Sequence, residues 1–209
     1  MISSQFFSEQ ICVALRLGIN SYSKHRCVCS SLVDESGTQG VSCSRAKGTF
    51  PRHVVFNHII HRALTSTRRS STLEPLGLSR DDGKRPDGVT LAPWSKGKRL
   101  VWDVTCVDTL APSYLNITSK LAGSAAERAC NNKHKHYTKI KASGFLVAGL
   151  AFETLGPWCK EMKSFIDTIG KMLIEESGDI RAKQFLCIIG HTTGKSNKHS
   201  RNTPNGQQI

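Results

Sequence analysis

The chain has 209 residues, of which 38% are hydrophobic and 22% charged, so we expect most of it to fold as one domain with a small appendage. Its 29 Lys and Arg side chains and 16 Asp and Glu side chains give a formal net charge of +13. This excess favours polyanionic partners such as nucleic acid, although a generally basic soluble protein fits the charge equally well. No apolar run approaches the ~20 residues of a membrane-spanning helix, and no secretory leader is recognisable, so we expect an intracellular protein without a membrane partner.

The first quarter of the chain has little periodicity. Residues 1–24 predict a weakly helical segment, and residues 25–53 are rich in Cys, Gly and Ser. Three cysteines and a histidine in the second region are the residue types that tetrahedral zinc prefers. These candidate zinc ligands are Cys27, Cys29, Cys43 and His53. His25 competes with His53 for the fourth position, and buried cysteines without a metal are the alternative.

A helix is predicted over residues 52–64, where apolar side chains recur at helical spacing. A polar, basic linker over residues 65–72 follows it. Glu74 then lies in a short apolar segment that reaches Leu78. It is either a third acid of a functional site or an exposed loop residue.

The most informative segment runs from Pro86 to Val107, where two apolar runs flank a turn rich in Gly and Lys and so predict a β-hairpin. Asp103 lies inside an apolar strand, where Asp is disfavoured, and the hairpin would bring Asp87 beside it. Two adjacent carboxylates repel each other unless a cation lies between them, and Mg²⁺ prefers oxygen ligands and phosphates. The pair therefore indicates metal-assisted phosphodiester hydrolysis. Local hydrogen bonding to the backbone is the alternative role for each aspartate.

A second helix is predicted from a capping box, with Ser124 as the N-cap and Glu127 at the third helical position, to about Lys139. Lys133 and Tyr137 are four residues apart and so share one face of it, where the lysine could stabilise a phosphate. His134 and His136 fall on different faces and are not expected to form a metal pair.

Basic side chains near these motifs are expected to contact a phosphate backbone, with a solvated basic surface as the alternative. The predicted nucleic-acid-binding residues are Arg85, Arg128, Lys135 and Lys139.

The last third of the chain predicts alternating elements. An apolar run over residues 145–152 indicates a buried strand, and an amphipathic helix begins after Gly156 and stops near Gly178. Residues 184–189 predict a final strand, and the polar tail over residues 190–209 is expected to be disordered.

Taken together, these motifs resemble the restriction-like endonuclease domain of site-specific non-LTR retrotransposons, which belongs to the PD-(D/E)XK nuclease superfamily. The resemblance is densest from Leu73 to Leu110, which includes the Arg85–Gly88 and Leu100–Val107 motifs, and extends roughly from Cys27 to Ile189. It implies an α/β (α+β) fold, with a restriction-endonuclease-like central mixed sheet flanked by helices. The implied divisions are an N-terminal segment (1–24), a remnant of a Cys-Cys-His-Cys zinc knuckle (25–53), the nuclease domain (54–189) and the tail (190–209).

The resemblance also implies a chemistry, an endonuclease that hydrolyses DNA with Mg²⁺ or Mn²⁺. Asp87, Asp103 and the carbonyl of Val104 would hold the metal, and Glu74 would be the supporting acid. The strand lysine that the family carries two places after its second acid is replaced here by Thr105, so its role would pass to the helix lysine.

That helix lysine matches Lys133, four residues before Tyr137. Gln39 stands where the zinc knuckle expects histidine. The implied partners are DNA and an element RNA or reverse transcriptase supplied elsewhere, in the nucleus, with no small-molecule cofactor. The alternatives are a catalytically inactive nucleic-acid-binding remnant and a translated relic.

Overall fold

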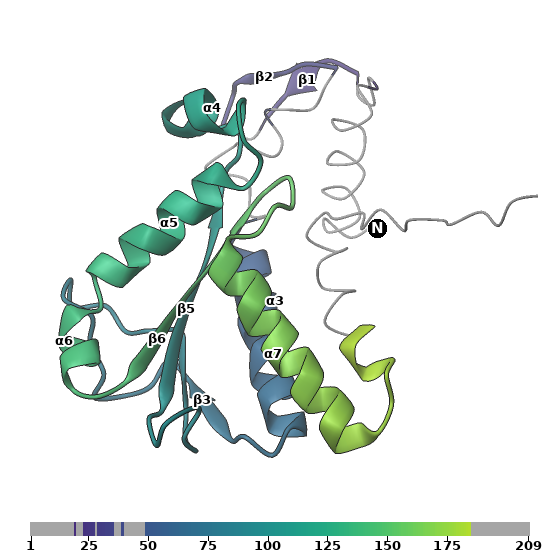
Figure 1. The fold of residues 1–209 in the computed structure, drawn as a ribbon. Coiled ribbons are helices and arrows are strands. Elements are labelled where there is room, and N and C mark those ends of the chain that lie inside the picture. Colours follow the sequence, from purple (N-terminus) through teal and green to yellow (C-terminus); the bar gives the residue numbers. More distant parts are fainter. Residues whose placement is uncertain (1–18, 20–22, 28, 36–38, 40–48, 185–209) are drawn as a thin grey trace, which may run out of the picture.

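The computed structural model describes residues 19, 23–27, 29–35, 39 and 49–184. A four-stranded mixed sheet, flanked by helices, forms the centre of the described chain, which confirms the predicted α/β class (Figure 1). The strands are β1 (His25–Arg26), β2 (Leu32–Val33), β3 (Ser71–Leu73), β4 (Gly88–Thr90), β5 (Leu100–Val107) and β6 (Leu146–Glu153). The helices are α3 (Thr49–Ser66), α4 (Pro112–Thr118), α5 (Ser124–Lys135), α6 (Thr138–Ala142) and α7 (Lys160–Ser177).

The sheet has the strand order β3-β4-β5-β6, antiparallel from β3 to β5 and parallel between β5 and β6. The predicted hairpin is confirmed, because β4 pairs with β5 with Gly88 opposite Trp102 and Val89 opposite Val101. A Cβ atom at Gly88 would lie 2.1 Å from the Trp102 ring, so only glycine fits beneath this indole. The same register, continued by one residue, places Asp87 opposite Asp103.

Helices cover both faces of the sheet (Figure 1). On one face, α3 and α7 pack against β5 and β6, and the stripe of α7 that contains Met162, Phe165 and Ile169 is buried. On the other face, the buried alanines Ala125 and Ala126 belong to α5, which lies against β6. Gly178 ends α7 with φ = 68°, as predicted for a C-cap glycine.

The prediction of a capping box that starts at Ser124 is wrong. The N-cap of α5 is Gly123, with φ = 88°, and the buried Ser124 Oγ makes no hydrogen bond in the part of the chain that the structure describes. The carboxylate of Glu153, at the end of β6, instead accepts hydrogen bonds from the N–H groups of Ala125 (3.0 Å) and Ala126 (3.4 Å). A carboxylate from a neighbouring strand thus takes the role that a local side chain was expected to fill, because the end of β6 lies beside the start of α5.

The helix predicted to reach Lys139 is divided in two. It ends at Lys135, and α6 begins at Thr138, so Tyr137 lies in the junction. The first predicted helix is longer than expected, since α3 runs from Thr49 to Ser66.

Several predicted features fall outside the described residues, among them most of residues 1–24, Cys43 and the tail over 190–209. The strand predicted over residues 184–189 is described only at Gln184, which is helical. Within the described chain, none of the helices combines the length and the apolar character needed to cross a membrane.

Candidate active site

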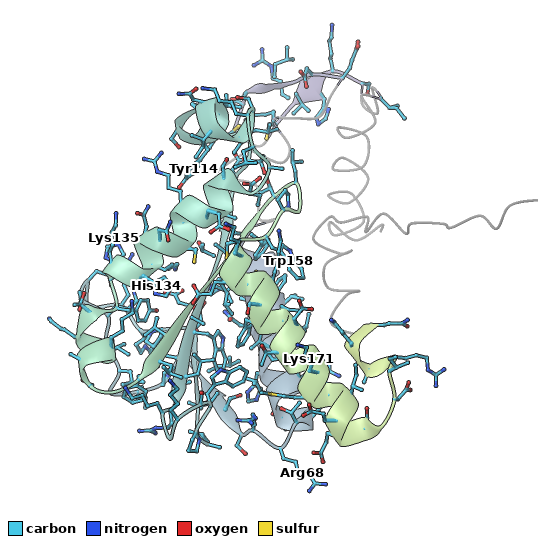
Figure 2. All side chains as sticks on the ribbon, in the orientation of Figure 1. Arg68, Tyr114, His134, Lys135, Trp158 and Lys171 are labelled. Carbon is cyan, nitrogen blue, oxygen red and sulfur yellow. The ribbon has the colours of Figure 1, made fainter. Side chains whose placement is uncertain are left out.

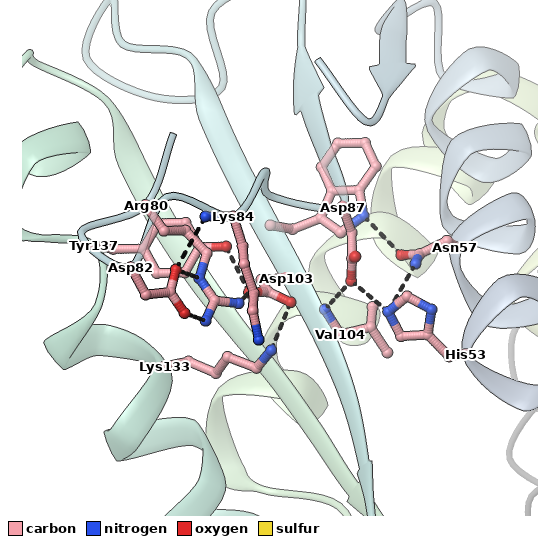
Figure 3. Close-up of polar contacts among 11 residues, drawn as sticks. His53, Asn57, Arg80, Asp82, Lys84, Asp87, Asp103, Val104, Lys133 and Tyr137 are labelled. Carbon is pink, nitrogen blue, oxygen red and sulfur yellow. Dashed lines mark hydrogen bonds and ion pairs between the residues drawn. The ribbon is translucent and has the colours of Figure 1, made fainter. Parts of the chain in front are cut away.

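Asp103 lies at the centre of a polar cluster on the α5 side of β5. Its carboxyl oxygens accept hydrogen bonds from Lys133 Nζ (2.7 Å), Arg80 Nη1 (2.8 Å) and the Tyr137 hydroxyl (2.5 Å) (Figure 3). The Asp103 side chain is only 4% exposed. A buried carboxylate needs partners of this kind, because desolvation of an unpaired charge is costly.

Arg80 reaches Asp103 from the loop between β3 and β4. Its guanidinium also pairs with Asp82 (2.5 Å) and lies over the Tyr137 ring, 5.6 Å from the centroid. No motif in the sequence predicts this arginine. No periodicity marks it, and its distance of 23 residues from Asp103 hides the contact.

Asp87 lies on the other side of the cluster, toward α3 (Figure 3). Its Oδ2 atom accepts the N–H of Val104 at 2.6 Å and lies 2.9 Å from His53 Nε2. Asn57, one turn further along α3, lies 3.4 Å from the same histidine nitrogen and accepts a hydrogen bond from the Trp102 indole N–H. At Val104 it is therefore the backbone amide that contacts Asp87, whereas the carbonyl was the predicted metal ligand.

The two predicted acids lie together, as the hairpin requires. Ligand atoms of Asp87, Asp103 and His53 all lie within 4.8 Å of one another. The positive charges of Lys133 and Arg80 offset the repulsion between the carboxylates. The cluster is therefore balanced by side chains of the protein itself, where the sequence suggested a metal cation.

Hydrogen bonding between His53 and Asp87 shifts both groups toward their charged forms. The hydrogen bond to Asp87 raises the pKa of His53 above 6.5, against the opposing effect of burial. Burial alone would raise the pKa of Asp87, but the hydrogen bond and charge of His53 and the Val104 amide outweigh it and lower that pKa. The pair is thus held as imidazolium and carboxylate over a wider pH range than either group alone.

Tyr137 acts as a neutral hydrogen-bond donor. Burial, followed by the negative charge of Asp103, raises the pKa of Tyr137 well above its ordinary value. Its hydroxyl therefore keeps its proton and directs it at the carboxylate, which orients Asp103.

Glu74 is not brought to the site. It follows β3 with φ = 45°, its side chain is 75% exposed, and it pairs loosely with Arg85 at 3.7 Å. The resemblance implies a supporting acid close to Asp87. The helix residue that contacts Asp87 is His53 on α3, so no acidic side chain of α3 takes that role. Thr105 lies on β5 where the family's strand lysine is expected, and Lys133 reaches Asp103 from α5 instead.

The predicted nucleic-acid-binding side chains lie in different surroundings. Arg85 pairs with Glu74, Arg128 lies over the Tyr114 ring, and Lys135 donates to Asn132 on its own helix. Lys139 is exposed on α6. Lys135, on the helix that carries Lys133, and Lys139, on the helix after it, are thus accessible from solvent.

The predicted zinc set is not assembled by the described residues. His53 contacts Asp87, and the side-chain amide of Gln39 donates to Cys29 Sγ at 3.2 Å. His25 lies on the exposed strand β1, where its ring contacts the carbonyl of Ser23. The expected histidine position of the knuckle thus holds a side chain that hydrogen-bonds the sulfur.

The donor set at Asp87 and Asp103 suits a hard divalent cation. Mg²⁺ is commonly held by one or two carboxylates while waters and phosphate oxygens complete its octahedron. A carboxylate has about four acceptor positions, and two protein donors at Asp87 leave capacity for a cation. At Asp103 a cation would compete with Lys133 and Arg80, so these side chains would have to yield part of their contact.

Neither a protein-family model nor a curated protein matches the chain.

Proposed function

We propose that this chain is a Mg²⁺-dependent DNA endonuclease domain derived from a site-specific non-LTR retrotransposon. The observation that supports the proposal best is the convergence of Asp87, Asp103 and Lys133. Asp87 directly precedes β4, Asp103 lies on the paired strand β5, and Lys133 comes from the helix α5. A buried structural carboxylate also needs cationic partners, so it is the second carboxylate close to Asp103, a charge of the same sign, that favours a metal-binding role.

The roles of the residues follow from their charges. Asp87 and Asp103 would hold Mg²⁺, or Mn²⁺ in its place, and the ion when bound would supply a Lewis acid beside the scissile phosphate. Lys133 would turn from Asp103 to a phosphate oxygen and stabilise the charge that develops there. Tyr137 would keep Asp103 in position through its hydroxyl. His53, whose pKa is raised by its hydrogen bond to Asp87, would be the candidate proton donor to the leaving oxygen.

The decisive experiment is nicking of supercoiled plasmid by the purified full chain in Mg²⁺, Mn²⁺ or EDTA. We expect metal-dependent nicking that falls about a hundredfold or more in Asp87→Asn and Asp103→Asn, because loss of the cation removes several kcal/mol of charge stabilisation. Asp167→Asn is the matched control, since Asp167 is an exposed aspartate on α7 whose ion pair with Lys183, at 2.7 Å, involves none of the cluster residues. Circular dichroism establishes that each variant is folded.

Two outcomes contradict the proposal. Nicking that is equal in all four proteins identifies a contaminating nuclease. A folded wild-type chain that leaves the plasmid intact in both metals excludes the activity for this chain.

A second function, binding of nucleic acid without cleavage, is favoured by one observation. Both oxygens of Asp103 already accept donors from Lys133, Arg80 and Tyr137, which is how a carboxylate is held when it serves structure alone. A chain that shifts DNA in a gel equally with and without metal, and does not cut it, would support this function. In either case the proposed partner is DNA in the nucleus, with element RNA or a reverse transcriptase supplied by another protein.

A further inference from the structure

A second cluster of metal-ligating side chains lies between α5 and α7, separate from the two aspartates. It consists of Cys130, His134 and Glu161, whose ligand atoms all lie within 4.8 Å of one another. Glu161 Oε2 is 2.6 Å from His134 Nε2 and accepts the Cys130 thiol at 3.0 Å. One carboxylate oxygen thus lies beside both a sulfur and an imidazole nitrogen.

The positions of these residues in the elements explain the convergence. Cys130 and His134 are four residues apart on α5 and so lie on one face of the helix. Glu161 belongs to the first turn of α7. Gly149 on β6 lets the helix approach closely, because a Cβ atom there would meet the Cys130 carbonyl at 3.1 Å and its sulfur at 3.4 Å. The glycine N–H also lies 3.3 Å from Glu161 Oε2.

We infer that Cys130, His134 and Glu161 form a zinc site that joins α5 to α7. A sulfur, an imidazole nitrogen and a carboxylate oxygen are the three ligand types that Zn²⁺ takes in proteins. The mixture excludes Mg²⁺ and Ca²⁺, which prefer oxygen alone. This inference does not depend on the proposed nuclease activity.

Charge and protons balance on binding. Cys130 releases its thiol proton to solvent as its sulfur binds the ion, His134 binds as the neutral ring through Nε2, and Glu161 binds as a carboxylate. The two negative ligands then match the charge of Zn²⁺. Tetrahedral ligands at roughly 2.0–2.3 Å from the metal lie roughly 3.3–3.6 Å apart, so Glu161 Oε2 would move about 0.6–0.7 Å away from both His134 Nε2 and Cys130 Sγ.

The fourth position is assigned to water. Cys159 is not part of this cluster and caps α7, because its sulfur accepts the N–H groups of Met162 (3.3 Å) and Ala151 (3.5 Å). The His134 and Glu161 side chains are 29% and 32% exposed, so solvent reaches the cluster. Figure 2 shows His134 on α5 beside Lys135, an exposed residue that is not part of the cluster.

The test measures zinc content and Co²⁺ spectra of the full chain after removal of metal and reloading. The double variant His134→Gln with Glu161→Gln is compared with the control His136→Gln with Glu175→Gln, which changes an exposed histidine after α5 and an exposed glutamate near the end of α7. We expect the first double variant to hold one zinc equivalent fewer than wild type and the control to hold the same number. Zinc bound at the N-terminal cysteines contributes equally to all three proteins and cancels in the difference.

Affinity and stability give independent readouts. We expect His134→Gln and Glu161→Gln, each as a single variant, to bind zinc at this site at least about tenfold more weakly than wild type. Even the loss of a residue that only hydrogen-bonds a metal ligand weakens metal binding by about 10–100-fold. Zinc should raise the melting temperature of wild type more than that of the double variant. The near-ultraviolet sulfur-to-Co²⁺ band should weaken in Cys130→Ser and persist in Cys106→Ser. Equal zinc content in wild type and the ligand double variant would overturn the inference, as would a Co²⁺ spectrum unchanged by Cys130→Ser.

Discussion

At the scale of single residues, the candidate active site is a balance of charges around two carboxylates. Asp103 is paired with the cations Lys133 and Arg80, and Asp87 with His53, while the Val104 amide donates a hydrogen bond to Asp87. A divalent cation and these donors compete for the same oxygens. The affinity of the site for a metal ion therefore depends on Lys133, Arg80 and His53 as well as on the two aspartates.

One prediction at this scale concerns the titration of His53. Its pKa is raised chiefly by the hydrogen bond to Asp87, so Asp87→Asn should lower it toward the ordinary value. NMR titration of the histidine ring in the metal-free chain measures the shift, with His58, an exposed histidine on the same helix, as the internal control. An unchanged His53 titration in Asp87→Asn would contradict the assigned cause.

The sign of the associated stability follows from the direction of the shift. Because the folded pKa of His53 lies above the unfolded value, its contribution is fully present below the unfolded pKa. It is lost as pH rises through the folded pKa. Asp87 acts in the opposite sense, since its lowered pKa contributes stability that is lost as pH falls through the folded value.

At the scale of elements, the start of α5 is fixed by a strand that lies beside it. Glu153 is 1% exposed, and its carboxylate accepts the first free N–H groups of α5. A negative group at this end of a helix is also favoured by the helix dipole. The position of α5 matters for function, because the helix carries Lys133 toward Asp103.

Replacement of this cap should be costly. We expect Glu153→Ala to lower the free energy of unfolding by about 2 kcal/mol or more, because it leaves buried N–H groups without an acceptor. Glu153→Gln keeps an acceptor oxygen and should lose less. Denaturant unfolding measures both, beside Glu175→Ala, an exposed change expected to stay within about 0.5 kcal/mol of wild type. If Glu153→Ala unfolds at the same denaturant concentration as that control, the cap contributes nothing.

At the scale of the whole molecule, the formal charge of +13 predicts salt-sensitive binding to DNA in the absence of metal. Lys135 and Lys139 are exposed on α5 and α6, on the face of the sheet from which Lys133 approaches Asp103. Replacing both by glutamine should reduce the slope of log affinity against log salt by about two, since each phosphate contact contributes roughly 0.9. Anisotropy of labelled duplex DNA in EDTA at several salt concentrations gives the slope.

The matched control removes the same charge from the opposite face of the sheet. Lys163 and Lys171 are exposed on α7, and their double glutamine variant should keep the wild-type slope apart from a small long-range effect. Equal slopes for the two double variants would place the DNA contacts elsewhere or show that binding follows net charge alone.

The sequence by itself determined the local parts of this protein. The apolar run that starts at Leu100 predicted β5, the turn at residues 95–98 predicted its hairpin with β4, and the hairpin led to the expectation that Asp87 and Asp103 meet. The apolar stripe of α7 and its stop at Gly178 were likewise readable. These features follow from the periods of strands and helices, which depend only on neighbouring residues.

Only the tertiary structure decided which distant residues join the two acids. His53 and Arg80 come from 34 and 23 residues away, Glu153 displaces the local capping box, and Glu161 meets Cys130 and His134 from another helix. No periodic pattern encodes such contacts, because they form only when helices and loops that are distant in sequence pack against the same sheet. Burial then selects partners by charge and hydrogen bonding. The chemistry of both sites thus depends on packing that the local sequence pattern leaves open.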